Sequence, residues 1–176
     1  LRSIEGAMPL KSLTLAIKNE LPEDFSLGSI INKDANLKVL DLSDSQFKNI
    51  PTKFSSYYPR LETLILNNTI EIIGNDAFKD LSCLNNIVLP KKLKKIGNGG
   101  LCNIGKIGNI KSLDFRDTQL ETLEFKSLYS DASLKIYIPT TVTTIGRNAF
   151  GNNTTVYYKG TATGAPWGAK EVITEF

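Results

Sequence analysis

Apolar residues recur along the chain in a fixed local spacing, apolar-x-x-apolar-x-apolar, which returns at nearly regular intervals. The copies are Leu10/Leu13/Leu15, Leu37/Leu40/Leu42, Leu61/Leu64/Leu66, Leu84/Ile87/Leu89, Ile110/Leu113/Phe115 and a shortened Leu134/Ile136/Ile138. The central residues are separated by steps of 27, 24, 23, 26 and 23 residues. The last two apolar positions alternate with other residues, as in a short strand with one buried face. One such strand cannot bury its face alone, so the pattern predicts stacked turns with parallel strands around a continuous core.

Each predicted strand is followed by a second motif, apolar-x-x-Ile-Gly-x-x-Ala-Phe. Its clearest copies occupy residues 70–78, 93–101 and 142–150, the second with Gly-Leu in place of Ala-Phe. We expect the isoleucines and the phenylalanine row to pack in the core. We expect the glycines of the motif, Gly74, Gly97 and Gly146, to be turn positions able to take a positive φ, which glycine adopts without a steric penalty.

Together, the two motifs resemble the BspA-like class of leucine-rich repeat, whose pattern reads LxxIxLPxxLxxIGxxAFxxxxxL. The match is close over residues 61–101 and 134–160 and weakest before residue 37. The asparagine ladder of other leucine-rich repeats is missing, because its positions hold Ser45, Thr69 and Thr118. The resemblance implies an adhesin or interaction module of a surface or secreted protein and not an enzyme.

The spacing and the resemblance predict one leucine-rich-repeat solenoid of about six to seven stacked rungs. We expect a parallel concave β-sheet, with short strands, turns or helical segments on the convex side. The single domain, 1–176, would comprise an irregular N-terminal rung (1–36), core repeats (37–150) and a last strand with a C-terminal cap (151–176). The last strand is predicted at Val156–Tyr158, with Trp167, Val172 and Ile173 covering the final rung.

The composition narrows the functional classes. The chain has 21 basic and 18 acidic residues, and a net charge of +3 predicts neither nucleic-acid binding nor steering to a membrane. No apolar run approaches the roughly 20 residues that a membrane span needs. The chain has no histidine, which removes the histidine-based nucleophilic sites and nearly every catalytic zinc site. We therefore expect no enzymatic activity, no cofactor and no metal.

The two cysteines, Cys83 and Cys102, do not have metal-ligand spacing. They are interpreted as free, mostly buried thiols or, in a secreted protein, as a single disulfide.

Candidate binding residues lie between the last two apolar positions of each repeat, where side chains point outward from the predicted sheet. This row contains Asp41, Ile65, Val88, Asp114, Tyr137 and Tyr157. Outward apolar residues on adjacent strands form patches that often mark interfaces, and tyrosine is a common anchor there. The alternative is that β-branched and aromatic residues simply favour strands.

Charged residues offer weaker candidates. Asp41 and Asp114 are about three strands apart, or about 14 Å, which exceeds the roughly 5–9.5 Å between glycosidase carboxylates. Lys91, Lys92, Lys94 and Lys95 form the one charge run. This basic turn either meets an acidic glycan or phosphate, or is a solvated edge that aids solubility.

The sequence thus predicts an extracellular or cell-surface module that binds a protein or glycan through its concave strand face. The localisation follows from the resemblance alone. The alternative is a structural spacer within a larger surface protein that has no specific ligand.

Overall fold

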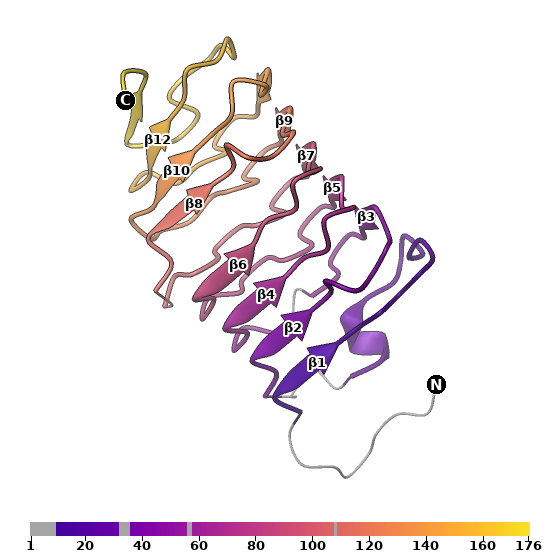
Figure 1. Cartoon of the computed structure of the whole chain (residues 1–176). Coiled ribbons are helices and arrows are strands. Elements are labelled where there is room, and N and C mark those ends of the chain that lie inside the picture. The colour runs from indigo at the N-terminus through magenta and orange to yellow at the C-terminus, as the bar shows by residue number, and fades with distance from the viewer. Residues whose placement is uncertain (1–9, 32–35, 56–57, 108) are drawn as a thin grey trace.

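The computed structural model describes residues 10–31, 36–55, 58–107 and 109–176, which form a solenoid of short parallel strands (Figure 1). The chain advances by one rung per repeat, and strands of successive rungs lie side by side. The predicted solenoid is therefore confirmed.

Three-residue strands on one side of the solenoid, here called the strand face, carry the first motif. They are β1 (Ser12–Thr14), β2 (Val39–Asp41), β4 (Thr63–Ile65), β6 (Asn86–Val88), β8 (Ser112–Asp114), β10 (Lys135–Tyr137), β12 (Thr155–Tyr157) and β13 (Glu171–Ile173). The predicted repeat centres are in register, with Leu40 opposite Leu64 and Ile136 opposite Val156. The last strand is β13, which pairs in parallel with β12, and not the strand at Val156–Tyr158 that the sequence predicts.

The strand face consists of two sheets and not of one continuous sheet. The N-terminal sheet has the order β1-β2-β4-β6 and the C-terminal sheet the order β8-β10-β12-β13, and β6 and β8 are not hydrogen-bonded neighbours. At the break, the Asn109 amide donates to Asn85 Oδ1 at 2.8 Å. In the preceding rung the equivalent amide, that of Cys83, donates instead to a backbone carbonyl, that of Pro59, at 3.2 Å. A side-chain oxygen thus takes the place of a backbone carbonyl where the longer rung begins.

Two-residue strands on the opposite side carry the Ile-Gly motif. They are β3 (Asn49–Ile50), β5 (Ile72–Ile73), β7 (Lys95–Ile96), β9 (Thr122–Leu123) and β11 (Thr144–Ile145). They form one five-stranded parallel sheet, in which β7 pairs with β9 across the break on the strand face. This back sheet therefore joins the two halves of the solenoid. The one helix in the described ranges is the short 3-10 turn η1 (Leu27–Ser29).

The space between the two sides is filled by the apolar residues of both motifs. Phe54, Phe78 and Phe150 are at most 1% exposed, and the Phe54 and Phe78 rings meet edge to face at 5.9 Å. The phenylalanine row is therefore core packing, as expected. Turns after the strands are held by hydroxyls where other leucine-rich repeats use asparagine. Thr69 Oγ1 donates to the Phe47 carbonyl at 3.1 Å, and Ser45 Oγ donates to the Leu15 carbonyl at 2.6 Å.

The motif glycines are needed for a different reason than the one predicted. Gly74, Gly97 and Gly146 do not have a positive φ, which falls two positions later, on Asp76, Gly99 and Asn148. Instead, these glycines lie against the preceding rung. A Cβ on Gly74 would be 2.5 Å from the Ile50 carbonyl oxygen, and one on Gly146 would be 2.7 Å from the backbone of Glu124. The glycines permit the close approach of rungs.

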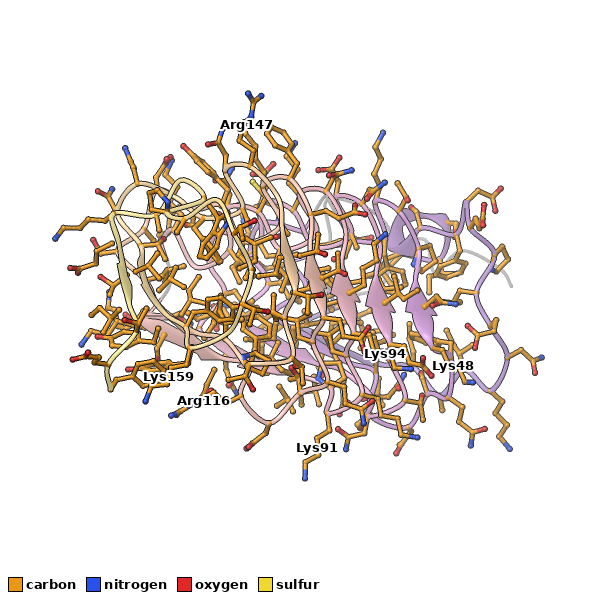
Figure 2. All side chains as sticks on the ribbon, turned by 90° about the horizontal axis from the view of Figure 1, so that it is seen from above. Lys48, Lys91, Lys94, Arg116, Arg147 and Lys159 are labelled. Atoms are coloured by element: carbon orange, nitrogen blue, oxygen red, sulfur yellow. The ribbon has the colours of Figure 1, made fainter. Side chains whose placement is uncertain are left out.

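Gly146→Ala is expected to lower the free energy of unfolding by about 1–3 kcal/mol, the usual cost of overpacking. The added methyl would meet only backbone atoms of Glu124 and Phe125, which cannot rotate away. The matched control is Arg147→Ala, since Arg147 is exposed and points into solvent (Figure 2). Urea denaturation followed by circular dichroism measures both variants. Equal stabilities would show that the rungs have room to separate.

Trp167 lies at the C-terminal end of the solenoid and covers its last large core residues. Trp167 is 6% exposed and contacts Phe150 and Tyr158 edge to face, at ring-centre distances of 6.4 and 5.8 Å. Its Nε1 donates to the Thr163 carbonyl at 2.8 Å. Val172 and Ile173 are half-buried in β13. At the other end, residues 1–9 of the predicted N-terminal rung lie outside the described residues, and β1 pairs in register with β2.

Candidate functional site

The row of predicted binding residues lies on the strand face but is divided by the break. In the N-terminal sheet, Asp41, Ile65 and Val88 stand opposite one another. In the C-terminal sheet, Asp114, Tyr137 and Tyr157 do the same. The structure therefore brings the six residues together as two groups of three.

The three side chains of the N-terminal group do not form a binding cluster. The carboxylate of Asp41 accepts a hydrogen bond from the Ser43 amide at 2.9 Å, which closes a local turn. Ile65 is half-buried, and Val88, at the edge of its sheet, is 44% exposed. One exposed apolar side chain is normal for a protein surface and does not make a patch.

The C-terminal group belongs to an aromatic cluster formed by Tyr137, Tyr157 and Phe176. The two tyrosine rings are stacked with their centres 4.5 Å apart, and Phe176 meets Tyr157 edge to face at 5.4 Å. Two cations border the cluster, with Arg116 4.7 Å from the centre of the Tyr137 ring and Lys159 4.5 Å from that of Phe176. Arg116 and Lys159 lie on the same side of the molecule (Figure 2). Phe176 and the two cations were missed by the sequence reasoning, because they lie outside the repeat motif.

Asp114 supports the cluster and does not offer a free carboxylate. Arg116 Nε lies 2.9 Å from Asp114 Oδ1, and the Arg116 amide donates to the same oxygen at 3.0 Å. The hydrogen bond from the guanidinium lowers the pKa of the Asp114 carboxyl. The pair holds the Arg116 side chain over one face of Tyr137.

The basic turn does not form one cationic site. Lys94 Nζ pairs with Glu71 at 2.8 Å and Lys95 Nζ pairs with Glu124 at 2.6 Å, whereas Lys91 and Lys92 are exposed. Lys94 lowers the pKa of Glu71 mainly through their hydrogen bond. In Figure 2, Lys91 points away from the body of the molecule. This arrangement favours the interpretation as a solvated edge.

A depression on the C-terminal sheet brings together residues that the sequence reasoning did not group. It has a volume of about 530 Å³, and we call it the basic depression. Its lining residues are Lys111, Ser112, Ser133, Leu134, Lys135, Tyr137, Asn153, Thr155 and Lys170. Tyr137 is shared with the aromatic cluster, so the two features are continuous. Lys135 begins β10 within a repeat, but Lys170 precedes β13, whose sequence carries no repeat motif.

The cysteines and acidic residues of the described ranges do not form a reactive or metal-binding site. Cys83 and Cys102 are both free thiols, and burial raises the pKa of Cys102, which keeps it in the unreactive thiol form. No three of the described cysteine, aspartate and glutamate residues lie close enough together to hold a metal ion. Among the same residues, no helix is long and apolar enough to cross a membrane.

Comparison with known proteins identifies the same repeat in the sequence. The BspA type leucine rich repeat region matches residues 33–161 in six copies, which is more than half of the chain. No curated protein matches. The crystal structure of a leucine-rich repeat protein from Bacteroides ovatus ATCC 8483 superposes with a TM-score of 0.60 at 20% identity. The match covers 86% of this chain and 38% of that chain, so this chain spans well under half of the length of that relative.

The Bacteroides structure supports the solenoid fold, and the region matched by the six repeat copies contains the strands from β2 to β12. Repeats of this kind generally serve as interaction or repeat modules. The chain belongs to the BspA type leucine-rich-repeat family.

Proposed function

We propose that this chain is a binding module of a cell-surface or secreted protein, and that it recognises its ligand through the C-terminal sheet of the strand face. It acts by binding and not by catalysis. The observation that carries the proposal is the continuity of the aromatic cluster with the basic depression through Tyr137. Clustered aromatic side chains and a concave surface are the features that most often accompany binding sites.

Neighbouring side chains hold the aromatic cluster in a fixed arrangement. Tyr137 is held between Tyr157 on one side and Arg116 on the other, and Arg116 is fixed by Asp114. A side chain that is already ordered loses little conformational entropy when a ligand binds. The N-terminal sheet has no comparable arrangement in its outward row.

The test compares matched double variants in a binding screen. The intact chain is applied to a panel of immobilised extracellular-matrix proteins and to a glycan array. Tyr137→Ala with Tyr157→Ala is expected to weaken each specific hit at least about tenfold, as loss of central aromatic contacts does. The control, Asp41→Ala with Ile65→Ala, alters the same row of the N-terminal sheet and is expected to leave binding unchanged. Hits that survive the tyrosine variant but not the control would contradict the proposal.

A structural spacer is the second candidate. It is favoured by the length of the Bacteroides relative, in which the matched region is 38% of a longer chain. A spacer requires no ligand, so absence of any hit in the same screen would favour it.

A further inference from the structure

Three lysines of the basic depression carry positive charge that the protein does not neutralise. Lys111, Lys135 and Lys170 are exposed and form no ion pair with any described residue. Some lysines elsewhere are paired with carboxylates on neighbouring rungs, as Lys94 is with Glu71 and Lys95 with Glu124, whereas others, such as Lys91, are exposed and unpaired among the described residues but do not line the basic depression. None of the nine residues that line the depression is acidic. The depression is therefore electrostatically complementary to an anion.

The three lysines are spread along the solenoid and not clustered at one point. Lys111 directly precedes β8, Lys135 begins β10, and Lys170 directly precedes β13. Backbone hydrogen bonds fix this spacing, because the Lys135 amide donates to the Lys111 carbonyl and the Lys170 amide donates to that of Thr154. Adjacent strands lie about 4.8 Å apart, which is close to the length of one pyranose residue in an extended polysaccharide. Successive sugar residues can thus meet successive rungs.

The remaining lining residues present small polar groups. Ser112 and Ser133 offer hydroxyl groups that hydrogen-bond to sugar hydroxyls in either direction. The Thr155 hydroxyl donates to Glu171 and Asn153 Nδ2 donates to the Asp131 carbonyl, so the oxygens of these two side chains serve as acceptors. The volume of about 530 Å³ lies in the range of small-ligand sites and does not require the broad surface of a protein interface.

The aromatic cluster argues against a nucleic acid as the ligand. Single-stranded nucleic acids are bound through bases that stack on free aromatic faces. Both faces of Tyr137 are covered, one by Tyr157 and the other by Arg116. The Tyr137 hydroxyl group can still donate and accept hydrogen bonds, as sugar hydroxyls require.

We propose that the basic depression binds a short stretch of an acidic polysaccharide, with Lys111, Lys135 and Lys170 as partners of its carboxylate or sulfate groups. This inference rests on the proposed function and specifies its ligand class. Glu171 marks the border of the site, where its carboxylate accepts a hydrogen bond from Thr155 Oγ1 at 2.8 Å.

Titration calorimetry on the intact chain tests the inference with defined probes. An oligogalacturonate tetramer supplies carboxylates, its methyl ester is the uncharged counterpart, and a heparin-derived tetrasaccharide supplies sulfates. At least one acidic probe is expected to bind, and the methyl ester to bind about tenfold more weakly or less than the free acid if carboxylate is the preferred group. Preference for the uronate or for the sulfated probe identifies the anionic group, and either preference supports the inference.

Single substitutions locate the site. Lys135→Gln and Lys170→Gln are each expected to lower the affinity about tenfold by removing a charge-assisted contact. Lys91→Gln is the control, because Lys91 is an exposed lysine outside the depression. Glu171→Gln is expected to raise the affinity severalfold, which a merely structural role of this surface residue would not produce.

Two results would overturn the inference. One is binding of neither acidic probe, or binding that is equal for Lys91→Gln and Lys135→Gln. The other is tighter binding of a single-stranded oligodeoxythymidylate, which would identify a nucleic-acid site. If the tyrosine double variant still abolishes the hits of the screen while the lysine variants do not, the ligand class is wrong but the proposed binding surface stands.

Discussion

Phe78→Ala is expected to lower the free energy of unfolding by about 3–5 kcal/mol. Phe78 is 0% exposed and lies in the middle of the array, with the Phe54 ring 5.9 Å from its own. The Phe78 amide donates to the Gly100 carbonyl, and this hydrogen bond fixes the backbone at Phe78 to the next rung. The rungs cannot close fully over the cavity that alanine leaves, and the lost contacts are not recovered.

The matched control is Phe125→Ala, because Phe125 is 41% exposed and has the Lys126 ammonium 5.3 Å from its ring centre. This variant is expected to change the free energy of unfolding by less than about 1 kcal/mol, since surface substitutions usually have small effects. Guanidinium denaturation followed by circular dichroism measures both. Similar losses for the two phenylalanines would mean that the inner row does not hold the rungs together.

Trp167→Ala is expected to cost about 3–5 kcal/mol for a second reason, because it opens the end of the solenoid. Trp167 covers Phe150 and Tyr158, the last large residues of the core. In a solenoid each rung is stabilised mainly by its neighbours, so the loss falls on the C-terminal rungs first. The C-terminal sheet, which contains the candidate site, is therefore expected to melt before the N-terminal sheet.

Hydrogen exchange resolves this order of melting, with faster exchange in β12 and β13 of the variant than in β2 and β4. Trp167→Phe is the control, because it retains a buried ring and loses the hydrogen bond to Thr163. Its expected cost is about 1 kcal/mol, the net worth of a typical hydrogen bond. If the amides of all these strands exchange equally slowly in Trp167→Ala, Trp167 does not act as a cap.

The repeat was predictable because burial leaves a direct trace in the sequence. Residues such as Leu40, Leu64 and Ile136 must face the core in every rung, and their spacing predicts the strands and their register. The break between β6 and β8 leaves no such trace, since Ile87 and Leu113 keep the apolar pattern on both sides of it. The role of Gly146 was also hidden, because a close approach between rungs depends on distances and not on composition.

The candidate site was predictable only in part. The outward row follows from strand alternation, so Tyr137 and Tyr157 could be named in advance. Their stacking depends on the register of β10 and β12, and the Arg116 contact depends on a turn that the repeat does not specify. Lys170 reaches the depression because β13 pairs with β12, although the segment before it follows no repeat spacing.

The location of the binding surface is tested most directly by amide chemical-shift mapping of the ¹⁵N-labelled chain with the heparin-derived and oligogalacturonate tetrasaccharides. We predict that the shifts concentrate in and just before β8, β10, β12 and β13, around the nine residues of the basic depression. The amides of β1, β2, β4 and β6 are predicted to remain unperturbed. Shifts centred on the N-terminal sheet or on residues 91–95, or no shifts with either probe, would contradict the assignment of this surface.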